Sequence, residues 1–151
     1  MSQFDPAAFL DQSIEGQLDT KMTPCPEGEF VAVIESVNPR PWNSKDGTKA
    51  GVALDVLWNI DDAGVKATLG RDKILVKQGI MLDLDATGQR LDVSKGKNIN
   101  LGRLREALGM NDASQPFSFN MLPGRAARVK VTHRIEGEDV YADIKMVTKI
   151  A

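Results

Sequence analysis

The sequence predicts a mainly β domain of five strands, with one α-helix between the third and fourth strands and an N-terminal arm. Three observations predict this fold class. Apolar and polar residues alternate in most segments between residues 30 and 150. That period of two changes once to a helical spacing, near residues 100–109. Residues 1–26 carry neither pattern over any length and run into TPCPEGE, where two prolines and a glycine interrupt regular structure.

The arm, residues 1–26, has one short helical signal. Asp5 followed by Pro6 is typical of an N-cap and a first-turn proline, which predicts a helix over about residues 6–10. Residues 1–30 contain six acidic side chains and one basic one, whereas the rest of the chain has 18 basic and 15 acidic. We therefore expect an acidic arm attached to a mildly basic domain, residues 27–151.

Within that domain each expected element follows from its own pattern. Strands are predicted over residues 30–37, 52–60, 73–84, 126–135 and 140–150, with a short extra one over 65–69. Trp58 falls on the apolar face of the second strand and is expected in the core. In NLGRLREALG the apolar residues share one helix stripe, with Asn100 as the expected cap and Gly109 as the end. This element order is that of an OB-fold-like barrel; an open antiparallel sandwich with a helix plug fits the periodicity equally well.

Composition excludes several classes of protein. Apolar residues make up 42% and charged residues 26%, as in a folded globular domain. No apolar run approaches the roughly 20 residues that span a bilayer. The first 20 residues lack the basic-then-apolar order of a signal peptide. We expect a cytoplasmic protein that does not contact membranes.

Catalytic chemistry finds little support in the sequence. The chain has one cysteine, Cys25, and one histidine, His133, and no GxSxG, HExxH, CxxC or P-loop motif. DLDATG resembles the first half of a calcium loop, but its twelfth position is Ser94 and its flanks are strand-like. A hydrolase or nuclease would depend on scattered carboxylates that no spacing singles out. We expect no enzyme, no metal and no cofactor.

Binding chemistry is better represented. The segment NPRPWNSKDGTKAG, residues 38–51, reads as a flexible loop that places Trp42 among cations. Single-stranded nucleic acid is bound by basic grooves with aromatic rings that stack on bases, and in an OB-fold the loop between strands 1 and 2 flanks that groove. The alternative role for Trp42 is a cap over the barrel end. The expected contact residues are Arg40, Trp42, Lys45, Lys49, Lys73, Lys77, Arg128, Lys130, Tyr141 and Lys145.

The lead-in DTKMTPCPEGEF, the strand VAVIESV and the helix GKNINLGRLREALG resemble small phage-encoded single-stranded DNA-binding proteins of OB-fold type, over about residues 17–150. The resemblance implies sequence-independent binding of single-stranded DNA in phage replication or recombination, in the host cytoplasm. Proteins of this type often carry an acidic C-terminal tail that recruits partners. This chain ends in KMVTKIA, so the acidic arm would have to recruit replication or recombination proteins instead.

Two hypotheses of different classes follow. The first is a non-enzymatic single-stranded DNA-binding protein, in which Trp42 and Tyr141 stack on bases and a homodimer or higher oligomer extends the groove. The second is a phage structural or assembly module, whose barrel and arm contact neighbouring proteins. The net charge of −2 favours the second, and the composition of residues 38–51 favours the first.

Overall fold

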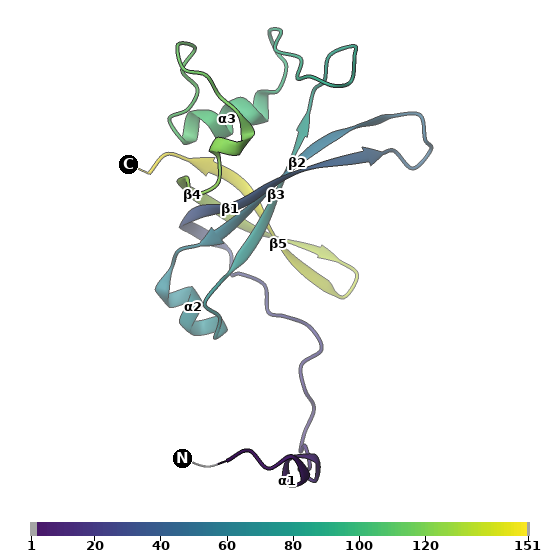
Figure 1. Ribbon diagram of the computed structural model, residues 1–151, viewed down its shortest axis with the longest axis vertical. Coiled ribbons are helices and arrows are strands. Elements are labelled where there is room, and N and C mark those ends of the chain that lie inside the picture. Colours follow the sequence, from purple (N-terminus) through teal and green to yellow (C-terminus); the bar gives the residue numbers. More distant parts are fainter. Residues whose placement is uncertain (1–2, 151) are drawn as a thin grey trace.

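The structure, a computed structural model, describes residues 3–150. Its body is one antiparallel sheet in the order β3-β2-β1-β4-β5 (Figure 1). The strands are β1 (Gly28–Asn43), β2 (Ala50–Ile60), β3 (Leu75–Leu82), β4 (Ala126–Glu136) and β5 (Asp139–Thr148). The helices are α1 (Pro6–Leu10), α2 (Ala63–Leu69) and α3 (Ile99–Ala107), with a 3-10 turn at Phe119–Met121. The mainly β, five-stranded prediction is confirmed.

The sheet does not close into the barrel that we predicted. In the described residues the hydrogen-bonded ladders join β1 to β2 and β4, β2 to β3, and β4 to β5, but none joins β3 to β5. Alternation fixes which side chains face the core. It does not determine whether the two outer strands come within the roughly 5 Å that pairing requires. The sheet therefore keeps two open edges.

Strand β1 is longer than predicted, because it continues through Pro39 and Pro41 to Asn43. Ile34 still exchanges backbone hydrogen bonds with Gly124 and Arg125, and beyond it β1 forms a ladder with β2 alone within residues 3–150. The Ser44 N–H donates to the Lys49 carbonyl of the facing chain. Because N–H groups alternate in direction along a strand, those of Trp42 and Arg40 also point toward β2. Pro39 and Pro41 occupy the alternate positions, whose N–H groups would point away from β2. Proline has no N–H group, and at this edge no partner strand requires one. An edge is where a strand tolerates proline.

The helices match the prediction in part. Helix α1 begins where expected, and the Asp5 carboxylate accepts a hydrogen bond from the Ala7 N–H at 3.1 Å. Helix α3 lies between β3 and β4 as predicted, although its N-cap is Asn98 rather than Asn100. The short strand predicted over residues 65–69 is wrong, since these residues form α2. The Asp62 carboxylate caps α2, accepting a hydrogen bond from the Val65 N–H at 2.9 Å.

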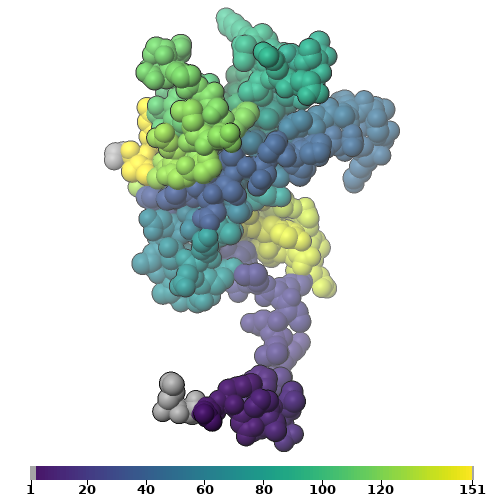
Figure 2. All heavy atoms as spheres, viewed as in Figure 1, coloured from purple at the N-terminus to yellow at the C-terminus, as the bar shows by residue number. Residues whose placement is uncertain are grey.

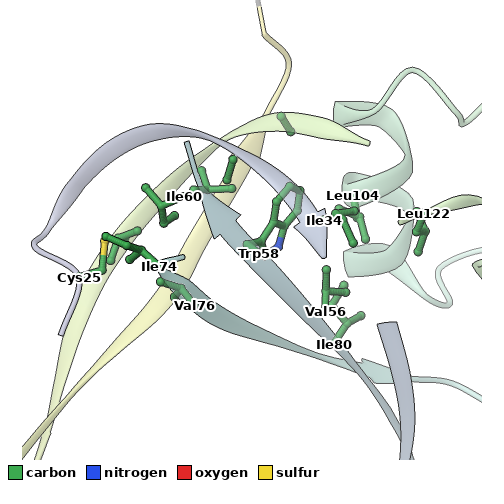
Figure 3. Close-up of a cluster of buried hydrophobic side chains, with 14 of the residues drawn as sticks. Cys25, Ile34, Val56, Trp58, Ile60, Ile74, Val76, Ile80, Leu104 and Leu122 are labelled. Carbon is green, nitrogen blue, oxygen red and sulfur yellow. The ribbon is translucent and has the colours of Figure 1, made fainter. Parts of the chain in front are cut away.

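Trp58 lies at the centre of the core, as predicted, with no exposed surface (Figure 3). Its indole Nε1 donates to Gln78 Oε1 on β3 at 2.9 Å. Leu104 of α3 and Leu122 extend the core at one end, and Cys25 extends it at the other. Cys25 thus belongs to the packed body, although we assigned it to the arm.

One irregularity in β5 changes which residues face outward. Lys130 is opposite Met146 while Val131 is opposite Ile144, so Lys145 is an extra, unpaired residue in β5. Such a bulge reverses the phase of a strand beyond it. Met146, two residues after Ile144, is therefore exposed, and Val147 packs against the core.

Candidate nucleic-acid interface

The β1–β2 hairpin projects from the body and carries the tryptophan that the sequence singles out (Figures 1 and 2). We predicted Trp42 in a flexible loop, and this prediction is wrong. Trp42 is the second-last residue of β1 and is directly opposite Gly51 of β2. Its ring packs flat on that glycine. A Cβ at residue 51 would lie 2.8 Å from the indole Nε1 and 2.9 Å from Cε2 and Cζ2. The ring therefore needs glycine at this position.

Packing on Gly51 holds the indole half-buried and in one place. Its Nε1 is enclosed and has no hydrogen-bond partner among residues 3–150. An enclosed donor without a partner is uncommon in a folded protein and marks a site that a ligand or water could complete. The hairpin thus presents a ring whose orientation is fixed before any ligand arrives.

The turn that joins the two strands is also ordered. The Asp46 carboxylate accepts hydrogen bonds from the Ser44 hydroxyl at 2.6 Å, the Thr48 hydroxyl at 2.7 Å and the Thr48 N–H at 3.0 Å. These three bonds lower the pKa of Asp46 to about 2, the Ser44 hydroxyl contributing most. Lys45 and Lys49 stand exposed on this fixed turn. Both lysines thus belong to the same hairpin as Trp42, three and seven residues further along the chain.

Below the hairpin, the outward face of β1, β2 and β3 has a floor of small residues. The ladders align Trp42 with Gly51, Arg40 with Ala53 and Met81, and Asp55 with Gly79. Of these small residues Gly79 is exposed, whereas Ala53 has no exposed surface and Gly51 is covered by the Trp42 ring. Around this floor stand Trp42, Arg40, Leu57, Lys77 and Met81. We did not predict the floor, although the alternation that placed Leu54 and Trp58 inward also placed Gly51 and Ala53 outward.

Two of the predicted cations are already neutralised. Arg40 makes a two-pronged contact with Asp55, with Nε to Oδ2 at 2.8 Å, and this carboxylate raises the pKa of Arg40. Lys73 lies before β3 rather than on it and pairs with Glu35, the bulged residue of β1. Neither cation is free to bind a phosphate without losing its carboxylate partner.

The remaining predicted cations form no salt bridge within the described part of the chain: Lys45, Lys49, Lys77, Arg128, Lys130 and Lys145. They do not gather in one place. Lys45 and Lys49 are on the hairpin, and Lys77 is on the same outward face. Arg128 is opposite Val31, eleven residues before Trp42 on β1, which corresponds to roughly 35 Å of strand. Arg128 and its neighbour Lys130 are thus far from the hairpin.

The predicted β5 residues lie at the open edge of the sheet. Between β3 and β5 run two adjoining clefts of about 780 and 750 Å³. Lys77 and Tyr141 line the first, and Lys145 lines the second. The Tyr141 ring is covered by the Arg134 guanidinium, 4.8 Å from its centroid, and is only partly free to stack on a base. We did not predict these clefts, since they exist only because the barrel is open.

Cys25 and His133 do approach each other, but not as a nucleophile and its base. The imidazole Nε2 lies 2.7 Å from the Cys25 carbonyl oxygen, and the thiol donates to the Pro26 carbonyl at 3.6 Å. Burial raises the pKa of Cys25 to about 11, although the Arg71 charge acts in the opposite direction. A reactive thiol has a lowered pKa and a partner at its sulfur. This pair instead fastens the start of the body to β4.

Comparison with protein-family models and with curated proteins finds no match to this chain. Within residues 3–150, no helix combines the length and the apolarity needed to cross a bilayer. The same residues contain no group of three or more potential metal ligands. Asp83, from the segment that resembles a calcium loop, bonds to Asn98, accepting a hydrogen bond from the Asn98 N–H at 2.8 Å.

Proposed function

We propose that this chain binds single-stranded nucleic acid without sequence preference, as a phage-type single-stranded DNA-binding protein, and that its open sheet is an OB-fold. An OB-fold is a partly open five-stranded barrel that binds oligonucleotides on the face of strands 2 and 3, flanked by the loop between strands 1 and 2. The strand order β3-β2-β1-β4-β5, with β3 and β5 on either side of one groove, supports this assignment.

The observation that carries the proposal is the Trp42 ring held on Gly51, in a hairpin whose turn exposes Lys45 and Lys49. Stacking on an aromatic ring is worth about 1–3 kcal/mol per base and tolerates any base, because every base has a π-face. Lysines that neutralise phosphates release counterions and make the affinity salt-dependent. A fixed ring next to two unpaired lysines supplies both parts of this recognition.

The small-residue floor extends the same surface toward Lys77. A nucleic-acid strand leaving Trp42 along this face would pass Met81, which is 51% exposed, and Gly79, which is exposed as well. We propose that these residues, rather than the distant Arg128 and Lys130, continue the path. Tyr141 and Lys145 would join it only where the path crosses to the β3–β5 groove.

A salt titration tests this assignment. Binding of fluorescein-labelled oligo-dT is followed by anisotropy at several salt concentrations, for the wild type and for Lys45→Gln/Lys49→Gln. We expect the slope of log affinity against log salt to fall by about 1.4 in the variant, 0.7 for each lost phosphate contact. Lys66→Gln on α2, whose lysine pairs with Asp61, is the matched control and should keep the wild-type slope. An unchanged slope in the hairpin variant would contradict the proposed interface.

The alternative, an assembly module, is favoured by one observation. The arm exposes several large apolar side chains that the body does not cover: Phe4, Phe9, Leu10, Ile14, Leu18 and Met22. Exposed apolar groups of this size are typical of protein-contact sites. A chain that assembles and shows no oligo-dT binding at low salt would favour this function over the first.

A further inference from the structure

The groove between β3 and β5 is bounded by two open strand edges. One cleft is lined by residues 75–77 and 140–143, and the other by residues 78–80 and 144–149. Because β3 and β5 each pair on one side only, the backbone groups of both edges that face the groove make no ladder within residues 3–150. Cα atoms of β3 and β5 approach within 8 Å, whereas a strand paired between them would hold them about 9.6 Å apart. The groove therefore has room for an extended segment lying over the two clefts, not for a strand paired with both edges. Exposed apolar side chains stand along the groove, including Leu75, Tyr141 and Met146.

The arm has the pattern of an extended segment that would fit such a groove. From residue 10 to residue 22 the apolar side chains occupy even positions (Leu10, Ile14, Leu18 and Met22). The acidic side chains in the same stretch occupy odd positions (Asp11, Glu15 and Asp19). In an extended chain this alternation puts the apolar groups on one face and the carboxylates on the other.

Charge is complementary between the two surfaces. Residues 3–20 contain four acidic side chains and no basic one. The second cleft is lined by three cations, Arg103, Lys145 and Lys149, and one acid, Glu106. The first cleft is also lined by more cations than acids, four against three. An acidic, apolar segment would therefore meet two clefts that are each lined by apolar residues and by more cations than acids.

The place where the arm leaves the body favours a second copy as the occupant. Lys21 pairs with Asp139 at 2.8 Å, and the Arg71 guanidinium donates to the Thr23 carbonyl at 2.6 Å, so residues 21–25 are fixed at the mouth of the first cleft. From there the chain runs away from the body, and α1 stands apart from it (Figures 1 and 2). If two copies face each other at the end of the first cleft from which the arm leaves, each arm reaches the groove of the other copy. This reciprocal exchange gives a closed, symmetric dimer.

We propose that residues 10–20 of one copy lie as an extended segment along the two β3–β5 clefts of a second copy, in a reciprocal dimer. The arm has ample length for this role. An extended strand rises about 3.3 Å per residue, so eight residues cover the length of β3, and the arm has 18 described residues before Lys21. The proposal does not depend on nucleic-acid binding.

Light scattering coupled to size exclusion tests the proposal on the full chain, and we expect a mass of twice 16.5 kDa at tens of micromolar protein. Ile14→Asp/Leu18→Asp places charge on the apolar face and should weaken the dimer at least tenfold. Ser13→Asp/Gln17→Asp adds the same charge on the opposite face, so this matched control should remain a dimer. A monomeric wild type, or a dimer unaffected by Ile14→Asp/Leu18→Asp, would overturn the proposal.

Mixing distinguishes exchange between copies from docking within one chain. A groove variant, Lys145→Glu/Met146→Asp, changes two exposed side chains and should also be monomeric. Mixed with the arm variant, it should form a heterodimer, because one intact arm then meets one intact groove. If both variants stay monomeric in the mixture, the arm binds its own groove and the exchanged dimer is wrong.

Discussion

Replacing Gly51 with alanine tests whether Trp42 is held as the structure shows. The added Cβ would lie 2.8–2.9 Å from three ring atoms, whereas an ordinary contact between such atoms is about 3.5–4.0 Å. The indole must move by roughly 0.6–1.2 Å or tilt off the hairpin. Overpacking of this size costs about 1–3 kcal/mol, partly offset by the 0.5–1 kcal/mol that alanine gains over glycine in a strand.

Gly79→Ala is the matched control for this substitution. Gly79 lies on the same outward face, and a Cβ there would meet nothing closer than Asp55 Oδ1 at 3.8 Å. We expect Gly79→Ala to raise the free energy of unfolding by about 0.5–1 kcal/mol. Gly51→Ala should be less stable than this control by about 1–3 kcal/mol. The comparison removes the backbone effect that both variants share.

Urea unfolding followed by circular dichroism measures the two stabilities, and the emission spectrum reports the surroundings of Trp42. Trp58 is fully buried in the core, so a spectral change confined to Gly51→Ala arises at Trp42. Oligo-dT affinity should fall in the same variant, by up to the factor of about 5–150 that a stacked base contributes. Equal stabilities of the two variants, together with an unchanged emission spectrum, would refute the packing of Trp42 on Gly51.

Three further predictions follow from other contacts. Asp55→Asn should release Arg40 for phosphate binding and steepen the salt slope for oligo-dT by about 0.7; an unchanged slope would show that Arg40 does not reach the ligand. Cys25, with its pKa raised to about 11, should react with iodoacetamide at pH 8 far more slowly when folded than in urea, and rapid alkylation of the folded chain would contradict its burial. Because the pKa of Asp46 is lowered to about 2, its bonds to Thr48 should persist above pH 4 and disappear as the pH falls through about 2, and an NMR midpoint near 4 for the Thr48 amide would be inconsistent with them.

Much of the fold follows from local pattern. The alternation around Trp58 and the cap at Asp5 each reflect interactions within a few residues or on one face of a strand, so the sequence contains them. Helix α2 is the exception: its signals are Asp62 as N-cap and Gly70, whose φ is 65°, as C-cap, and they stand at either end of the segment for which we predicted a strand. The prolines in β1 also indicated a loop. They are tolerated because that part of the strand has a free edge, a property of the whole sheet.

The site was less predictable, for a physical reason. Trp42 and its flanking lysines were evident from residue type, but the Arg40–Asp55 contact depends on the register of β1 against β2. The β3–β5 groove depends on where the outer strands stop short of pairing. Neither the register across strands nor the closure of a sheet is encoded in the period of one segment.

Intrinsic tryptophan fluorescence, titrated with oligo-dT at low and at moderate salt, tests the central claim most directly. Trp58 is enclosed and bonded to Gln78, so a ligand on the hairpin should quench Trp42 alone. We expect quenching of the wild type that weakens as salt rises and largely disappears in Trp42→Phe. No quenching at low salt and micromolar protein, or equal quenching in Trp42→Phe, would contradict a nucleic-acid interface built on this ring.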